Sequence, residues 1–124
     1  MEQVVTLWLG TFKSREDFYK YVYVAYTEDG DSIASQFEQD FDIEYYDRDT
    51  VEKDWVETME TDLYVLLEGF SYDNQIIQQF NKPEKSYNSI ILVYDFEYKR
   101  DIHKIDTQNY SIEMIGSARY DTDI

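Results

Sequence analysis

The sequence predicts an α+β fold, a small single-domain sandwich in which helices pack on a mixed or partly antiparallel sheet of three to five strands. Apolar runs of strand length lie near both ends of the chain, and between them apolar residues recur at helical spacing. The chain has 124 residues, of which 43% are hydrophobic. This is enough for one contiguous core, so we expect one domain over residues 1–124.

The first elements are a strand and a helix. Residues 4–9 are apolar on both faces and rich in β-formers, as is typical of a buried strand. Gly10 follows and allows a turn or a close approach of two backbones. Ser14 precedes three charged residues and predicts the N-cap of an amphipathic helix, because a serine hydroxyl accepts from free backbone N–H groups. The apolar face of that helix comprises Phe18, Val22, Ala25 and Tyr26.

Two further helical stretches are expected in the middle of the chain. Residues 28–32 have turn chemistry and end the first helix, after which apolar side chains recur every four residues. Residues 43–46 are expected to form a brief extended segment, and Asp47 or Asp49 to cap the next helical stretch. The side chains that share a face are Ile33, Phe37 and Phe41 in the first stretch, and Val51, Trp55 and Met59 in the second.

Helices are also favoured for residues 62–69 and for the pattern that runs from Ser71 to Phe80. Residues 81–85 contain the only proline and form a loop, because proline lacks a backbone donor and restricts the residue before it.

The last third of the chain predicts two strands. Residues 89–98 carry the strongest strand signal, and residues 110–114 alternate between apolar and polar side chains. We expect a hairpin to join them. Its loop, residues 99–108, holds almost the only basic cluster of the chain, which consists of Lys99, Arg100 and Lys104.

Acidic side chains are concentrated in one stretch. Residues 28–62 carry fourteen Asp and Glu side chains against only Arg48 and Lys53, a net charge of −12 out of −16 for the chain. Such a surface attracts a positively charged protein patch and repels nucleic acid and anionic membranes. Solubility is the simpler interpretation of the same charge. The stretch is rich in apolar residues, so we expect it to fold.

Several classes of function are disfavoured. The chain has no cysteine, which excludes disulfides and thiolate ligands and fits a reducing compartment. The first residues lack the pattern of a signal peptide, and the longest apolar run, residues 90–94, is far shorter than the roughly 20 residues that span a bilayer. Residues 29–31 and 47–49 do not fit the spacing of a calcium loop. We expect a cytoplasmic protein without a membrane segment, a metal or a cofactor.

Catalytic groups are few. His103 is the single histidine and lies in a charged loop, where a surface role is the simpler interpretation. Glu97 and Lys99, set against Asp73 or Asp95, are similar to the Asp plus Glu-x-Lys arrangement by which one nuclease superfamily holds magnesium. A nuclease also needs a basic surface for phosphates, which this chain mostly lacks. We therefore expect no enzyme and no small-molecule substrate, and a magnesium-dependent enzyme is only a third hypothesis.

Three segments carry a family resemblance. They are VTLWLG at residues 5–10, FEQDF with YYD at residues 37–41 and 45–47, and LLEGFSY at residues 66–72. In this order the segments resemble the Immunity protein 22 family of bacterial polymorphic toxin systems. The resemblance implies a small cytoplasmic α+β protein that binds a cognate toxin domain and blocks it without catalysis. It assigns no residues to the contact.

The acidic stretch suggests where such a toxin binds. The resemblance implies that the toxin is often a nuclease with a basic cleft, whose phosphate site an acidic inhibitor can cover. We expect carboxylates to combine with aromatic anchors, although core packing is the simpler interpretation for Trp8 and Trp55. The predicted toxin-binding residues are Glu38, Asp40, Asp42, Glu44, Tyr45, Tyr46, Asp47, Asp49 and Trp55. The alternative hypothesis is an acidic nucleic-acid mimic that inhibits a DNA-binding protein.

Overall fold

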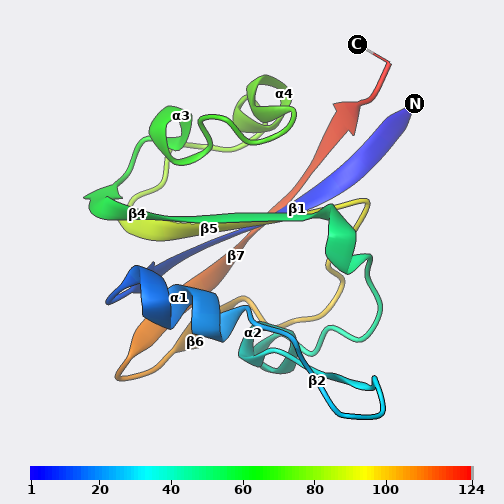
Figure 1. Ribbon diagram of the computed structural model, residues 1–124. Coiled ribbons are helices and arrows are strands. Elements are labelled where there is room, and N and C mark those ends of the chain that lie inside the picture. The colour runs from blue at the N-terminus through cyan, green and yellow to red at the C-terminus, as the bar shows by residue number, and fades with distance from the viewer. Residues whose placement is uncertain (124) are drawn as a thin grey trace.

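A five-stranded antiparallel sheet forms the centre of the molecule in a computed structural model that describes residues 1–123. The strand order is β4-β5-β1-β7-β6, so β1 lies in the middle and β4 and β6 form the two edges (Figure 1). The strands are β1 (Glu2–Phe12), β4 (Val51–Glu60), β5 (Tyr87–Tyr94), β6 (Lys104–Asp106) and β7 (Tyr110–Asp121). Every neighbouring pair is antiparallel. The predicted α+β fold is confirmed.

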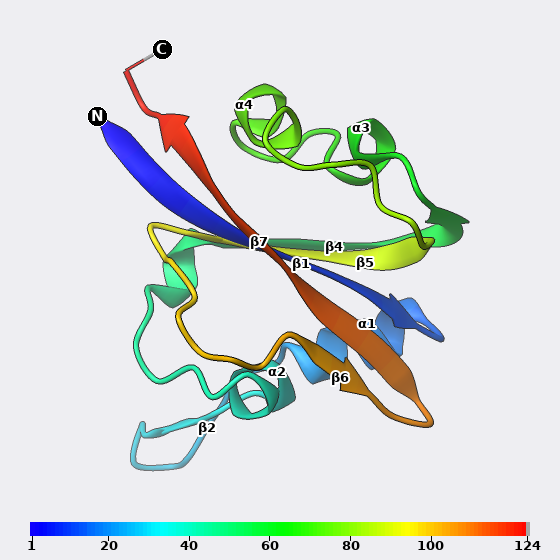
Figure 2. The same cartoon turned by 180° about the vertical axis from the view of Figure 1, so that it is seen from behind.

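Short helices cover both faces of the sheet. They are α1 (Arg15–Tyr21), α2 (Gln36–Asp40), α3 (Leu63–Leu66) and α4 (Asp73–Ile77). Figure 1 shows α3 and α4 on one side of the sheet and α1 and α2 on the other, and Figure 2 shows the same layers from behind. The smaller elements are the hairpin of β2 (Ala25–Tyr26) and β3 (Ser32–Ile33) and the 3₁₀ helix η1 (Arg48–Thr50).

The strands β1 and β5 send alternate side chains into two separate cores. Leu7 and Leu9 belong to the core beneath α3 and α4, whereas Trp8 and Phe12 belong to the core beneath α1 and α2. All of β5 is buried. Because both faces of these strands are covered, their sequences are apolar runs without polar alternation.

Trp8 is the centre of the core beneath α1 and α2. Its side chain is fully buried, and its ring lies edge to face with the rings of Phe37, Phe41 and Tyr98. The ring centroids are 5.0, 5.7 and 5.5 Å away, respectively. Such pairs add about 0.5–1.5 kcal/mol each to the gain from burial. Two of the three partners lie on or next to α2, so Trp8 fixes that helix against the sheet.

The edge strand β4 overturns one sequence prediction. The sequence predicts a helical stretch over residues 51–59, but these residues lie in a strand, and residues 51–55 pair with β5, beginning with Val51 opposite Val93. A spacing of four residues is a multiple of two, so Val51, Trp55 and Met59 share a face of a strand as well as of a helix. Asp47 acts as a cap, as predicted, but the element that it caps is η1.

The predicted hairpin between residues 89–98 and 110–114 is also wrong, because β1 lies between β5 and β7. The strand β5 ends at Tyr94, where Asp95 takes a left-handed φ of 57°. The strand β7 instead pairs with β6, which lies inside the predicted loop, and Ile105 is opposite Ile112. Alternation identifies a strand but not its neighbours, and the strand that is apolar on both faces takes the central position.

The helix α1 is shorter than predicted. It begins at the Ser14 cap, where the backbone N–H of Asp17 donates to Oγ of Ser14 at 3.1 Å. It ends at Tyr21, and the expected face residues Ala25 and Tyr26 lie in β2. The turn predicted for residues 28–32 joins β2 to β3 in a hairpin. The pairing of these two strands outweighs the helical spacing of the apolar side chains.

The helix α2 begins later than predicted, because Ile33 lies in β3 and is exposed. Residues 43–46 are irregular, although a brief extended segment was expected. The helices α3 and α4 fall within the predicted stretches, and residues 81–85 form the expected connection. No helix in residues 1–123 has both the length and the apolar character needed to cross a membrane.

The backbones of β1 and β7 approach closely at Gly10, which is one of the two roles that the sequence allows for this glycine. A Cβ atom added at Gly10 would lie 2.8 Å from the carbonyl oxygen of Ser111 and 3.2 Å from Cβ of Ile112.

We predict that Gly10→Ala lowers the free energy of unfolding by about 1–3 kcal/mol, because β1 and β7 must separate to fit the methyl group. Urea denaturation measures this. Lys13→Ala serves as the control, because Lys13 is exposed, and it should change the same free energy by less than about 0.5 kcal/mol. Equal stability of the Gly10→Ala and Lys13→Ala proteins would contradict the close approach.

Candidate functional site

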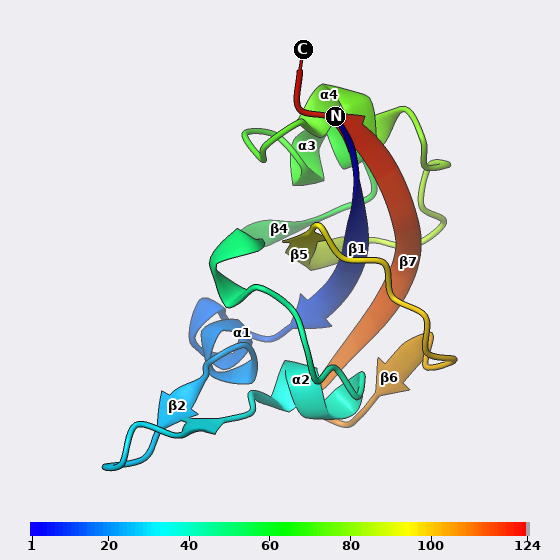
Figure 3. The ribbon, with the colours of Figure 1, turned by 90° about the vertical axis from the view of Figure 1, so that its right-hand side faces the viewer.

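Residues 42–49, hereafter the acidic segment, connect α2 with β4 on the outside of the molecule (Figure 3). Most of its side chains are exposed, and Tyr46 is half-buried. The exposed members are Asp42, Glu44, Tyr45, Asp47, Arg48 and Asp49. Five of the nine predicted toxin-binding residues are therefore exposed within one short segment.

The acidic segment is held at several points along its length. Asp42 takes a left-handed φ of 53° as α2 ends, and the backbone N–H of Ile43 donates to the Glu38 carbonyl oxygen at 2.9 Å. The side chain of Ile43 is buried in the core beneath α1 and α2. Near the other end, Asp47 accepts from the backbone N–H of Asp49 at 2.9 Å and so caps η1. These contacts anchor the backbone of the segment near both of its ends.

Glu38 is the inner anchor of the segment and is not accessible to a partner. Its side chain is only 2% exposed, and Arg48 donates from Nε at 2.9 Å and from Nη2 at 3.2 Å to the two carboxylate oxygens. Oε1 of Glu38 also accepts from the backbone N–H of Ser35 at 2.7 Å, which completes a capping box at the start of α2. Burial alone would raise the pKa of Glu38, but the hydrogen bonds from Arg48, Tyr46 and Ser35 outweigh it and leave the pKa below its usual value.

Asp40 is also occupied by contacts within the protein. Its Oδ2 accepts from the hydroxyl groups of Tyr21 at 3.0 Å and Tyr110 at 2.7 Å, and its Oδ1 accepts from Nε2 of Gln36 at 2.8 Å. Burial, together with the adjacent Asp40 carboxylate, raises the pKa of both tyrosines well above the usual value. Both hydroxyls therefore stay protonated and keep donating. Asp40 joins α1, α2 and β7, and it is only half-exposed.

Trp55 lies apart from the acidic segment. Its indole Nε1 donates to the carbonyl oxygen of Phe12 at 3.3 Å, and the guanidinium of Arg15 lies 5.5 Å from the ring centroid. These contacts tie β4 to β1 and α1. The interpretation of Trp55 as a packing residue thus accounts for its surroundings.

A small recess accompanies the acidic segment. Its volume is about 210 Å³, and Glu44 and Tyr45 line one side of it while Glu97 and Lys99 line the other. Arg100 forms an ion pair with Asp42 at 3.3 Å. The side chains of Glu44 and Asp49 have no ion-pair or hydrogen-bond partner within residues 1–123. These two carboxylates are therefore available to an external cation.

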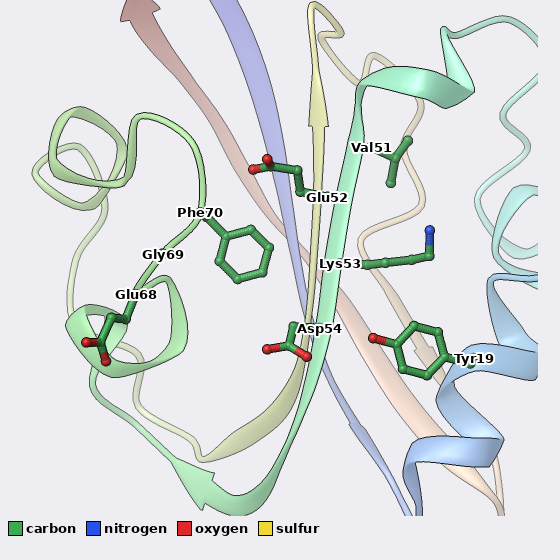
Figure 4. Close-up of a pocket in the computed structure, with 8 residues that line it drawn as sticks. All are labelled: Tyr19, Val51, Glu52, Lys53, Asp54, Glu68, Gly69 and Phe70. Carbon is green, nitrogen blue, oxygen red and sulfur yellow. The ribbon is translucent and has the colours of Figure 1, made fainter.

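A second hollow lies beside the edge strand β4 (Figure 4). Its volume is about 480 Å³, and Figure 4 shows Tyr19 on one side of β4 and Phe70 on the other. Glu52, in the wall beside Phe70, accepts from the backbone N–H and hydroxyl of Ser71 at 2.8 and 2.7 Å and from the Tyr94 hydroxyl at 2.7 Å. Burial raises the pKa of Glu52, but these hydrogen bonds outweigh that effect and lower it. The carboxylate thus fixes the connection between α3 and α4. Sequence reasoning missed this hollow because β4 had been interpreted as a helix.

The residues considered for catalysis have other surroundings. Asp73 accepts from the backbone N–H groups of Gly69 at 3.3 Å and Asn74 at 2.8 Å at the start of α4. Glu97 and Lys99 instead line the recess beside the acidic segment. Across the part of the chain that the structure describes, no group of three or more His, Cys, Asp or Glu side chains is arranged to hold a metal ion.

The fold and the surface define a class of protein, a small α+β scaffold with a densely packed sheet that carries a fixed and acidic connecting segment. The family model described as Immunity protein 22 matches residues 5–121, and the chain belongs to that family. The match runs from residue 5, inside β1, to the end of β7, so it includes residues from all five strands of the sheet. Comparison with curated proteins and with solved structures found no match.

The Glu38 and Arg48 pair predicts a pH-dependent contribution to stability. Because the folded-state pKa of Glu38 lies below its usual value of 4.5, the stabilisation is fully present above about pH 4.5 and is lost as the pH falls through the folded-state pKa. We expect Glu38→Gln to lower the free energy of unfolding by about 1–3 kcal/mol at pH 7, with a smaller difference from wild type near pH 3.

Denaturant unfolding at several pH values measures this difference. Glu44→Gln is the matched control, because it removes the same charge from an exposed position and should have an effect within about 0.5 kcal/mol. A difference between wild type and Glu38→Gln that stays constant down to pH 3 would show that the ion pair does not stabilise the segment.

Proposed function

We propose that this protein is an immunity protein that binds a cognate toxin domain and neutralises it, and that the acidic segment contacts a basic surface of the toxin. Membership of the Immunity protein 22 family supports the inhibitory role. The observation that carries the proposed surface is the combination of exposure and anchoring in residues 42–49. An anchored backbone loses little conformational freedom on binding, so more of the interaction energy of its carboxylates contributes to affinity.

The charge of the surrounding chain favours a basic partner. Between Lys20 and Arg48 the sequence has eight acidic residues and no Lys, Arg or His. Arg48, the first base after this stretch, is already engaged by Glu38. A field of one sign accelerates the encounter with a surface of the opposite sign and orients the two proteins before contact.

A nuclease is the toxin class that this charge fits best. An enzyme that cleaves nucleic acid needs a positively charged site for the phosphates, and the acidic segment offers carboxylates to the same cations. Tyr45, which is exposed at the centre of the segment, provides the apolar contact that binding sites of this kind use as an anchor. The contact should bury about 1,600 Å² in total, as stable protein complexes commonly do.

The mode of action is occupancy of the toxin rather than a reaction. The protein would act in the cytoplasm of the producing cell, where a cysteine-free chain is suited to the reducing environment. It would need no metal or cofactor, because blocking a cleft requires only complementary shape and charge.

Charge reversal tests the proposed surface. We predict that the double variant Glu44→Lys with Asp49→Lys slows association with the toxin about tenfold or more at low salt, because it removes two unpaired carboxylates and adds two cations to the contact. Stopped-flow association measured at rising salt concentration should also give a flatter dependence for the variant than for wild type.

The matched control is Glu57→Lys with Glu84→Lys, which makes the same change in charge at two exposed positions near the opposite end of β4. The control should retain most of the association rate and should protect cells that produce the toxin. If both double variants slow association equally, only the net charge matters and the acidic segment is not the contact surface.

A further inference from the structure

The hairpin of β2 and β3 projects from the body of the molecule beside α2 (Figures 1 and 3). Its tip has a defined backbone, since the N–H of Thr27 donates to the Asp31 carbonyl oxygen at 2.8 Å and the N–H of Gly30 donates to the Thr27 carbonyl oxygen at 3.0 Å. Gly30 has a φ of 87°, which this turn requires and which glycine adopts without strain. The backbone of the tip is therefore a defined turn at the end of the hairpin.

The hairpin carries large apolar side chains that the protein itself does not cover. Tyr26 of β2 and Ile33 of β3 are 64% and 50% exposed, and Tyr23, two residues before β2, is 68% exposed. A two-stranded sheet has no second layer, so these side chains cannot be buried within the hairpin. Aromatic side chains on a projecting element gain most when a partner covers them, because a tyrosine supplies a large contact area for little loss of rotamer freedom.

The tip of the hairpin is anionic. Glu28, Asp29 and Asp31 lie within and beside the turn, and their carboxylates have no ion-pair or hydrogen-bond partner in the described residues. The nearest bases along the chain are Lys20 and Arg48, and both are paired with glutamates, Glu16 and Glu38 respectively. The negative charge at the tip is therefore uncompensated by its own chain.

We propose that this hairpin is an arm that enters a concave, cationic site of the toxin. A projecting element fits a cleft rather than a flat surface, and three unpaired carboxylates at its end are complementary to lysine and arginine side chains at the bottom of that cleft. Tyr23, Tyr26 and Ile33 then contact the walls. This inference rests on the proposed function and adds to it which element enters the cleft: the hairpin occupies the anion-binding site, with the acidic segment at the rim, so inhibition competes with the substrate.

The hairpin and the acidic segment can engage one partner together. Ser35 lies two residues after the end of β3 and caps α2, and the acidic segment begins where α2 ends. The arm and the segment thus flank the same short helix, and Trp8 fixes that helix to the sheet through Phe37 and Phe41. A toxin that receives the arm in its cleft would meet the acidic segment at the rim of that cleft.

The arm is tested with a purified toxin domain from which this protein protects cells, made inactive by substitution for the binding measurements. Tyr26→Ala should raise the Kd at least about tenfold, because it removes an anchor from the arm. Tyr64→Ala is the matched control, since Tyr64 is 65% exposed on α3 at the other side of the sheet. The Kd of this control protein should stay within about twofold of wild type.

Removal of charge from the tip, by Glu28→Gln with Asp29→Asn, should slow association with the toxin, whereas Glu57→Gln with Glu84→Gln should not. None of these variants removes a buried contact, so thermal unfolding should be unchanged and loss of folding will not mimic loss of binding.

The outcomes separate the arm from the proposed function. If the arm variants bind as wild type does while charge reversal at Glu44 and Asp49 weakens binding, the inference about the arm is wrong and the proposed function stands. If wild type neither binds the toxin domain nor protects cells from it, the proposed function fails, and the arm fails with it. With active toxin, inhibition that a rising substrate concentration does not relieve overturns the inference that the arm fills the cleft.

Discussion

The burial of β1 and β5 on both faces is the constraint on which the rest of the structure depends. Both strands must be covered by apolar side chains from two layers, and five strands with four short helices achieve this in 124 residues. The interior of the sheet is thus unavailable for charged groups. The buried and half-buried carboxylates are all paired or hydrogen-bonded: Glu38 with Arg48, Asp40 with two tyrosine hydroxyls, and Glu52 with Ser71 and Tyr94.

This constraint places the charge of the chain on its connections. The excess of acid accumulates in the hairpin, in the acidic segment and on the edge strand β4, all of which lie outside the central strands. A rigid centre with charged connections suits a protein that must present a fixed surface to another protein. The core supplies the anchors, such as Ile43 and Trp8, and the surface between them supplies the carboxylates.

Much of the fold could be predicted from the sequence. Double-sided apolar runs identified β1 and β5, and the Ser14 cap located the start of α1. The order of the strands could not be predicted, because apolar patterns show that a strand is buried but not which strands lie beside it. The spacing of Val51, Trp55 and Met59 fits a helix and a strand equally, and only the pairing with β5 decides between them.

The exposed residues of the candidate surface were predicted only in part, because sequence patterns do not show side-chain contacts any more than they show strand order. Sequence showed where acidic residues gather, but it could not show that Glu38 turns inward to Arg48 or that Trp55 packs against Arg15. Those positions depend on contacts between residues that are distant along the chain or on opposite sides of a turn. The hairpin was missed because its strands are only two residues long and its apolar residues had been assigned to helices.

Amide hydrogen exchange, compared between the free protein and its complex with the toxin, locates the contact surface without any substitution. The proposed binding mode requires slower exchange in residues 23–33 and 42–49 of the complex, with little change in α3 and α4. Protection confined to α3, α4 or the outer edge of β4 would contradict it, since the toxin would then be held by a surface other than the acidic segment and the hairpin.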